Sequence, residues 1–366
     1  MSFIDGATDF AGRRNCGVNR MKRRLLVTGG AGFIGSNFVN YMVKHYPEYT
    51  INVYDKLTYA GNRSSLAACF LDPADKEHIF TEACVTDRSK MSEAIVGSDV
   101  IVHFACESHV SNSLAQADEF VNTNVFGTMV LCEEVVKYPV ERLIIISSSE
   151  VYGTAVTKPM DEDHPLNPAS PYAASKAGQD RIAFSYYYGF EIPLVIVRPF
   201  NQYGPIQHIE KAIPTFITNL LQDKKINIHN KGVQTRDWLY VEDLCRALDK
   251  VIHADREALI GETINIGSGR ETSILTIATR ICELLDKDVD AFVEFGMNRK
   301  GQVMSHISST EKVRKLLNWE PVVDIEEGLR LTVEWYRNNE AWWRSLRFPV
   351  LRIPERFRVH SGMASR

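Results

Sequence analysis

Short apolar runs alternate with longer amphipathic segments over the N-terminal part of the chain. Parallel strands are joined by crossover helices that cover both faces of their sheet, so this alternation predicts an α/β fold with a doubly wound parallel sheet. The expected order begins with a strand, a glycine turn and a helix within 22–46. Further strands are expected within 51–62, 78–87, 99–109, 141–153 and 193–205, and helices at about 118–138 and 170–190.

The pattern changes after residue 200, where helices outnumber strands. Residues 200–340 are therefore predicted to form a smaller α/β C-terminal lobe that binds the substrate and interleaves with a nucleotide-binding domain at 22–199. Residues 1–21 form an N-terminal extension, and residues 341–366 form a tail rich in arginine and aromatic residues. In the lobe, helices are expected near 212–222, 241–254, 273–286 and 325–339, and strands at 225–229, 262–268 and 290–295.

Composition narrows the class of protein only by exclusion. The net charge of −4 over 366 residues gives no reason to expect nucleic acid or an anionic membrane as a partner. The seven cysteines form no C-x-x-C pair and, with the histidines, no zinc pattern, so no metal is expected and a reducing, cytoplasmic location is predicted. No apolar run is long enough to span a bilayer, and the N-terminus lacks the apolar core of a signal peptide.

The glycine turn after the first strand carries a nucleotide-binding pattern. In "TGGAGFIGS", Gly29, Gly32 and Gly35 allow a tight turn and the close approach of a pyrophosphate to the N-terminus of the following helix. Asp55 ends the second strand about 20 residues later, where a carboxylate accepts hydrogen bonds from ribose hydroxyls and repels a 2′-phosphate. The sequence therefore predicts a Rossmann domain that binds NAD in preference to NADP, although the adjacent Lys56 weakens that preference slightly.

The helix expected at 170–190 carries candidate chemistry at its start. Ser170 is a predicted N-cap with Pro171 at the first helical position, which places Tyr172 and Lys176 on one helix face. A lysine ammonium near a phenol favours the phenolate. Such a tyrosine can take a proton from a sugar hydroxyl while hydride leaves for the nicotinamide.

At this point the chain resembles the extended short-chain dehydrogenases/reductases over roughly residues 22–340. Within them it is most similar to the nucleotide-sugar 4,6-dehydratases, particularly the dTDP-glucose 4,6-dehydratase type. The resemblance combines Y-A-A-S-K with T-G-G-A-G-F-I-G-S. The other resembling segments are "DKLTYAGN" (55–62), "ACESHV" (105–110), "NTNVFGT" (122–128), "SEVYG" (149–153), "SPYAASKA" (170–177), "EKAIP" (210–214) and "TRDWLYVEDLCRAL" (235–248).

This resemblance implies a three-stage reaction on a nucleotide-diphosphate sugar. NAD, with Tyr172 as base and Lys176 as its support, oxidises the C4 hydroxyl; Glu150 then removes the acidified C5 proton. Water leaves from C6, and the stored hydride returns to C6, so the cofactor stays bound. Glu150 follows a strand at the edge where ligands of open α/β sheets bind. The resemblance also implies a homodimer that pairs through the helix carrying Tyr172 and Lys176.

Further site residues are implied position by position. Contacts to the sugar nucleotide include Lys211 and Arg236, whose charge suits a pyrophosphate. The other implied substrate contacts are Ser108, Ser148 and Asn201. The implied cofactor contacts, beyond the glycines and Asp55, are Phe33, Ile34, Lys56, Leu57, Thr58, Thr123, Tyr172 and Lys176.

Ser148-Ser149-Glu150 departs from the resembling family, whose dTDP-glucose enzymes carry Thr-Asp-Glu there. Their aspartate is the proposed acid for the leaving C6 hydroxyl, and a serine has no comparable acidity. Either Glu150 handles both proton transfers, directly or through water, or the reaction is not a dehydration. GDP-mannose 4,6-dehydratases have a similar Thr-Ser-Glu, and UDP-glucuronate decarboxylases also have serine before glutamate. A 4-epimerase, a decarboxylase and a non-catalytic NAD-binding sensor therefore stay open beside the dehydratase. Differences at 111–112 and 300–303 leave the nucleotide and the sugar open.

Overall fold

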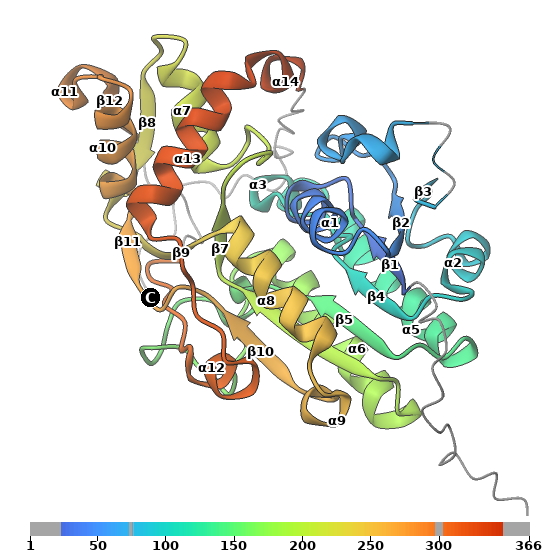
Figure 1. Ribbon diagram of the computed structural model, residues 1–366. Helices are drawn as coiled ribbons and strands as arrows, with labels where there is room; N and C mark the ends of the chain where they lie inside the picture. The colour runs from blue at the N-terminus through green and yellow to red at the C-terminus, as the bar shows by residue number, and fades with distance from the viewer. Residues whose placement is uncertain (1–22, 73–74, 76, 297–302, 347–366) are drawn as a thin grey trace, which may run out of the picture.

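The computed structural model describes residues 23–72, 75, 77–296 and 303–346. Its centre is a seven-stranded sheet in the order β10-β6-β5-β4-β1-β2-β3, with every neighbouring pair parallel (Figure 1). The doubly wound α/β fold predicted from the sequence is thus confirmed. The strands are β1 (Arg24–Thr28), β2 (Thr50–Asp55), β3 (Ile79–Glu82), β4 (Val100–His103), β5 (Arg142–Ile146), β6 (Leu194–Pro199) and β10 (Thr263–Ile266).

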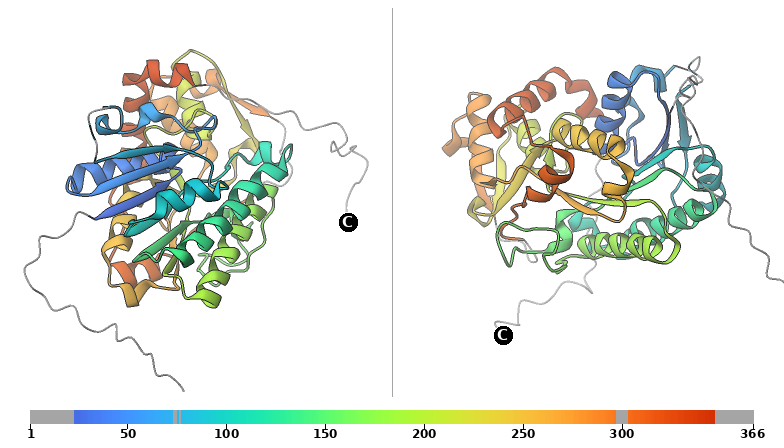
Figure 2. Two further views of the ribbon diagram at one scale, coloured as in Figure 1. Left: turned by 90° about the vertical axis from the view of Figure 1, so that its right-hand side faces the viewer. Right: turned by 60° about the horizontal axis from the view of Figure 1, so that its bottom comes forward.

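The central strands are buried along their whole length, and most of their residues are apolar, because helices cover both faces of the sheet. One core includes side chains of α1 (Phe33–His45) and α8 (Val241–His253), which pack together. The core on the other face includes side chains of α2 (Arg88–Ile95), α5 (Gly127–Lys137) and α6 (Pro171–Phe190). Figure 2 shows α5 and α6 running side by side on the outside of the sheet.

The helix expected at 118–138 begins as two shorter pieces before α5. These are α4 (Ala117–Phe120) and the π-helical η3 (Val121–Phe126), and η3 packs against α6. The short α3 (Val110–Ser113) precedes them. The interruption matters because Thr123, an expected cofactor contact, lies on η3.

The chain returns to the central sheet after residue 200, which the apolar pattern alone does not reveal. The sequence suggested a strand at 262–268 among the elements of the C-terminal lobe, but β10 pairs with β6, with Ile264 beside Val197. Parallel neighbours need a crossover, and α8 lies in the connection between β6 and β10. The strand expected within 193–205 likewise divides into β6 and β7 (Asn201–Tyr203), and β7 belongs to a different sheet.

The lobe contains two small sheets and its own hydrophobic core. β7, β9 (Thr235–Tyr240) and β11 (Glu271–Ser273) form one sheet; β8 (Ile226–His229) and β12 (Val293–Gly296) form the other. The strand expected at 290–295 was wrong in its first half, because α11 (Val289–Phe292) precedes β12. The remaining helices are α7 (Ala212–Leu220), α9 (Arg256–Leu259), α10 (Ile274–Leu284), α12 (Glu311–Leu317), α13 (Ile325–Asn338) and α14 (Glu340–Ser345).

Several sequence expectations fall outside the described residues. The N-terminal extension and the end of the tail beyond residue 346 lie there, as do residues 300–302 of the divergent segment. In the part of the chain that the structure does describe, no helix has the length and apolar character needed to cross a membrane.

Candidate active site

A cavity of about 490 Å³ lies where the carboxyl ends of the central strands meet the C-terminal lobe. This is the edge at which open α/β sheets bind their ligands. Of the predicted site residues, Leu57 alone does not line it. The expected cofactor positions on its wall are Gly29, Gly32, Phe33, Ile34, Gly35, Asp55, Lys56, Thr58, Thr123, Tyr172 and Lys176. The other expected catalytic and substrate positions on its wall are Ser108, Ser148, Ser149, Glu150, Asn201, Lys211 and Arg236.

The glycine turn leaves no room for larger side chains. Gly29 has φ +68, and a Cβ there would lie 2.5 Å from the backbone nitrogen of Ala105 on the loop after β4. A Cβ at Gly35 would lie 2.2 Å from the carbonyl oxygen of Gly29. Glycine is therefore required where the turn passes β4 and where α1 begins, and the backbone N–H groups at the start of α1 stay accessible to a phosphate.

Asp55 links the glycine turn to the loop after β2. Its Oδ2 accepts a hydrogen bond from the backbone N–H of Ala31 at 3.0 Å, and its Oδ1 accepts one from Leu57 at 2.8 Å. Burial raises the pKa of Asp55, and these two backbone donors act against that rise. Leu57 has φ +53 and contributes its N–H to Asp55 rather than a side chain to the cavity. The carboxylate keeps further lone pairs for ribose hydroxyls.

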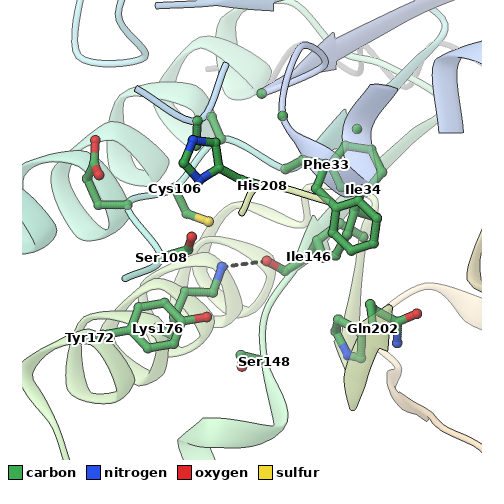
Figure 3. A pocket seen from close by; sticks show the side chains of 18 of the residues that line it. Phe33, Ile34, Cys106, Ser108, Ile146, Ser148, Tyr172, Lys176, Gln202 and His208 are labelled. Atoms are coloured by element: carbon green, nitrogen blue, oxygen red, sulfur yellow. Dashed lines mark hydrogen bonds between the residues drawn. The ribbon is translucent and has the colours of Figure 1, made fainter. Parts of the chain in front are cut away.

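Tyr172 and Lys176 reach the cavity from the first turns of α6. The N-cap is as expected: the Ser170 hydroxyl accepts the backbone N–H of Ala173 at 3.1 Å, with Pro171 at the first helical position. Lys176 is buried, and its Nζ donates to the carbonyl of Ile146 at 2.6 Å (Figure 3).

The electrostatics of the pair differ from the expectation. We expected Lys176 to favour the phenolate, but burial raises the pKa of Tyr172, and the hydrogen bond from Ser148 only partly opposes this. Burial also lowers the pKa of Lys176. The reason is desolvation, which penalises both charged forms in a cavity this enclosed.

A buried polar chain behind Lys176 escaped the sequence reasoning. Lys176 also donates to Gln179, and Gln179 donates through Nε2 to the hydroxyl of Thr128 at 3.0 Å. His103 contacts the same hydroxyl through Nε2 at 3.0 Å and Thr28 through Nδ1 at 2.6 Å. The chain thus ties α6 and α5 to β4 and β1. Its signal in the sequence is a polar residue at a position of each of these four elements that faces the core.

Glu150 and its serine neighbours occupy the short helix η4 (Ser149–Tyr152) at the end of β5. Ser148 caps η4, and its hydroxyl accepts the backbone N–H of Glu150 at 3.2 Å. Glu150 lies close enough to Tyr172 and Arg236 to raise the pKa of both groups, although burial lowers that of Arg236 more strongly. A carboxylate, a phenol and a guanidinium from three elements therefore share one end of the cavity.

Two further substrate positions, Lys211 and Ser108, lie next to each other on the cavity wall. Lys211 donates to the backbone carbonyl of Ser108 at 3.1 Å and pairs with Glu210 at 3.2 Å. Glu210 and Glu107 line the cavity but were not among the predicted site residues. Both lie in segments that carried the resemblance, "EKAIP" and "ACESHV", and burial raises the pKa of Glu107.

Fold and cavity together define a class of protein. A glycine turn and an acidic strand end mark the nucleotide half of the cavity; a Tyr-x-x-x-Lys helix and a glutamate mark the other half. This combination on a Rossmann sheet with a C-terminal lobe is that of an extended short-chain dehydrogenase/reductase.

The comparisons with known proteins identify the family within that class. The model of the GDP-mannose 4,6 dehydratase family matches residues 26–332, and the chain belongs to this family. It is 40% identical to a dTDP-glucose 4,6-dehydratase of Mycobacterium tuberculosis, over 88% of this chain and 96% of that protein.

Solved structures agree with this assignment. The dTDP-glucose 4,6-dehydratase DesIV of Streptomyces venezuelae, crystallised with NAD bound, superposes with a TM-score of 0.83 at 39% identity, covering 88% of this chain and 100% of that one. A UDP-glucose 4-epimerase of Thermotoga maritima gives a TM-score of 0.79 at 29% identity, covering 87% of this chain and 99% of that one.

Proposed function

We propose that this protein is an NAD-dependent nucleotide-sugar 4,6-dehydratase, a carbon–oxygen lyase. The observation that carries the proposal is the placement of Glu150 beside Tyr172 and Arg236 in the cavity that also contains the glycine turn. The reaction needs one base for the C4 hydroxyl and a second for the C5 proton, both within reach of the same sugar ring.

The residues of the nucleotide half suit NAD. The glycine turn presents backbone N–H groups to a pyrophosphate, and the Asp55 carboxylate accepts from ribose hydroxyls while repelling a 2′-phosphate. When bound, NAD would accept a hydride from C4 and later give it back at C6. Because the hydride is returned, a tightly held cofactor serves every turnover.

The residues of the other half supply the proton transfers. Burial raises the pKa of Tyr172, and the positive charge of a bound nicotinamide would oppose that rise and favour the phenolate. Tyr172 then takes the proton of the C4 hydroxyl, and Ser148, which hydrogen-bonds to Tyr172, orients that hydroxyl. The new C4 ketone acidifies the C5 proton, and the Glu150 carboxylate removes it. Lys211 and Arg236 bind the two phosphates of the substrate, for which charged donors are suited. Water then leaves from C6.

A homodimer is the second part of the proposal. The outer surface of η3 and α6 exposes large apolar side chains, including Val121 (53% exposed), Tyr188 (83%) and Phe190 (60%). η3 and α6 pack together, so these exposed apolar side chains are distributed along one pair of neighbouring helices. Two copies pairing through this face would remove it from water and place Tyr172 on a helix fixed by the interface.

A cytoplasmic location completes the proposal. Every cysteine that the structure describes is a free thiol, and three of these, Cys132, Cys245 and Cys282, are buried. Burial raises the pKa of each, which keeps them inert as thiols. Free buried thiols accord with a reducing compartment.

The competing activities make different demands on Glu150. A 4-epimerase returns the hydride to C4 and has no use for a base at C5, while a decarboxylase loses carbon dioxide. A sensor has no need of a tyrosine and a glutamate in one cavity with a hydride acceptor. The position of Glu150 therefore favours the dehydratase over the epimerase and the sensor, and product mass separates it from the decarboxylase.

Product mass discriminates among them. The protein is incubated with NAD and a panel of thymidine, guanosine and uridine diphosphate sugars, and the products are weighed by mass spectrometry. We expect loss of one water. Loss of carbon dioxide would establish the decarboxylase, and an unchanged mass with altered retention would establish the epimerase. NAD binding without any turnover would support the sensor.

A further inference from the structure

Departure of the C6 hydroxyl requires a proton, and at position 149, where the resembling dTDP-glucose enzymes carry an acid, this chain has a serine. Tyr172 and Glu150 act as bases at C4 and C5, so without a further donor Glu150 has to serve as both base and acid. Ser149 lines the cavity between Ser148 and Glu150, but a serine hydroxyl is not an acid at neutral pH. A buried group behind the cavity wall that contacts Ser149 would be able to supply the proton.

His306 lies there, on a segment held firmly in place. The histidine is fully buried, at 0% exposure, and does not line the cavity itself. The backbone on either side of it is fixed: Thr235 donates to the carbonyl of Met304 at 3.0 Å, and Met160 donates to that of Ile307 at 2.8 Å. Backbone hydrogen bonds on both sides of His306 therefore fix the position of its imidazole next to η4.

The two ring nitrogens of His306 have different partners. Nε2 lies 2.6 Å from the carbonyl oxygen of Gly153, which can only accept, so Nε2 carries a proton in both charge states. Nδ1 faces the hydroxyl of Ser149 at 3.5 Å, which is longer than the roughly 2.7–3.2 Å of an ordinary hydrogen bond, so the pair is in contact and would have to draw closer for proton transfer. In the neutral ring, Ser149 donates to Nδ1. In the imidazolium, Nδ1 donates to Ser149, whose own hydrogen is then free to point into the cavity.

The charges that face His306 are Glu150 on η4, and Arg236 and Asp237 on β9. Burial lowers the pKa of His306, Glu150 and Asp237 act to raise it, and Arg236 adds to the lowering. A protonated His306 therefore gives up its proton readily, while the neighbouring Glu150 carboxylate helps to restore it.

We propose that His306 acts through Ser149 to supply the proton that leaves with the C6 hydroxyl. This inference rests on the proposed function. As the C6–O bond breaks, its electron pair takes the Ser149 hydroxyl proton and leaves as water. Ser149 takes the Nδ1 proton in the same step, and His306 becomes neutral. Over the whole sequence Tyr172 gains the C4 hydroxyl proton, Glu150 gains the C5 proton, NAD would hold the hydride and His306 loses one proton, so the net charge of the site is unchanged. His306 is a positioning residue, since Ser149 makes the contact.

Other carboxyl groups on the cavity wall are poorly placed for this step. Among the charges that act on Glu107 are Lys56 and Asp55 of the nucleotide half, and Glu210 is paired with Lys211. Ser149 is instead adjacent in sequence to Glu150 and contacts a group that Glu150 affects electrostatically. His306 thus places a titratable group beside the C5 base.

The test compares His306→Gln in two backgrounds, the natural chain and Ser149→Asp. Glutamine can still donate to Gly153 but cannot carry a proton, and aspartate at 149 supplies a carboxylic acid directly. Single-turnover experiments in deuterium oxide follow C4 oxidation by NADH absorbance, C5 exchange by NMR and water loss by mass. His164→Gln removes another buried histidine outside the cavity wall and serves as the matched control.

We expect His306→Gln to slow water loss about 100-fold in the natural background while C4 oxidation and C5 exchange persist. It should also abolish the fall in the water-loss rate as pH rises through the pKa of His306. In the Ser149→Asp background the same change should slow water loss only a few-fold. His164→Gln should leave the ratio of water loss to C4 oxidation unaltered.

Equal slowing in both backgrounds, or equal slowing of all three steps, would overturn the inference. These outcomes differ from a failure of the proposed function. In that case the natural chain itself would oxidise C4 without releasing water, or would not turn over at all, and the role given to His306 would fall with it.

Discussion

At the residue scale, the account depends on two carboxylates with opposite duties. Asp55 is engaged by backbone donors and, in the proposed function, positions the nucleotide, whereas Glu150 acts electrostatically on Tyr172 and is the proposed base at C5. The sequence indicates both, because each lies directly after an apolar strand. It does not indicate His306, because that residue comes from a segment far along the chain and meets Ser149 only in the folded protein.

Glu150→Gln should separate oxidation from dehydration. The amide cannot take the C5 proton, so we expect C4 oxidation to persist, NADH to accumulate on the protein and water loss to fall by 10²- to 10⁴-fold. Absorbance at the NADH band and product mass measure the two steps. Asp161→Asn, an exposed carboxylate outside the cavity wall, is the control and should behave like the natural chain. Unchanged turnover of Glu150→Gln would contradict the role of Glu150 as base.

Asp55→Asn should weaken NAD binding and reduce discrimination against NADP. The neutral amide loses charge-assisted bonds to the ribose and no longer repels a 2′-phosphate, for a loss of about 1.5–3 kcal/mol in NAD affinity. Calorimetric titration with both dinucleotides measures the change. Equal affinity losses for NAD and NADP would instead assign Asp55 a purely structural part in the turn.

At the element scale, the polar chain Thr28–His103–Thr128–Gln179 joins four elements behind Lys176. Apolar periodicity predicts where these elements run, but not which polar side chains meet inside the core, because such pairs are fixed by packing between layers. The same limit explains β10: a short apolar strand looks alike in a lobe and in a central sheet, and only the crossover through α8 decides between them.

His103 should make stability fall in acid. Burial lowers the pKa of His103 to about 3, against an ordinary value of 6.5, so the unfolded chain takes up a proton at a pH where the folded protein does not. Its contribution is complete above about pH 6.5 and is lost progressively between pH 6.5 and 3, at up to about 1.4 kcal/mol per pH unit.

Urea unfolding at several pH values checks this expectation. His103→Asn, which cannot titrate, should lower the free energy of unfolding at pH 7.5 by about 1–3 kcal/mol, because its partners are imperfectly satisfied. It should also reduce the dependence of that free energy on pH below 6.5. The same steepness in both proteins would show that other groups cause the acid sensitivity.

At the scale of the whole molecule, the sheet domain contributes the glycine turn, Tyr172 and Glu150 to one cavity, and the lobe contributes Lys211 and Arg236. The sequence predicted most of this wall, since nearly every predicted residue lines it. It could not predict the electrostatics inside: Tyr172 has a raised rather than a lowered pKa because the closed cavity desolvates it. That effect depends on how completely the lobe covers the sheet edge.

Val121→Asp should dissociate the proposed homodimer. A carboxylate among the exposed apolar side chains of η3 and α6 would be buried without a partner on pairing, which is strongly unfavourable. Sedimentation velocity should show a monomer. Val322→Asp, at a still more exposed valine (71% exposed) outside η3 and α6, is the control and should leave the dimer intact. A monomeric natural chain, or a dimeric Val121→Asp, would contradict the pairing face.

The measurement that tests the central claim most directly is the fate of the hydrogen on C4. A nucleotide-hexose substrate from the active panel, labelled with deuterium at C4, is converted in ordinary water, and the product is examined by NMR and mass spectrometry. A 4,6-dehydratase with a retained cofactor should lose water and carry the deuterium at C6 of the same molecule. Deuterium returned to C4, or lost to solvent without loss of water, would contradict the account.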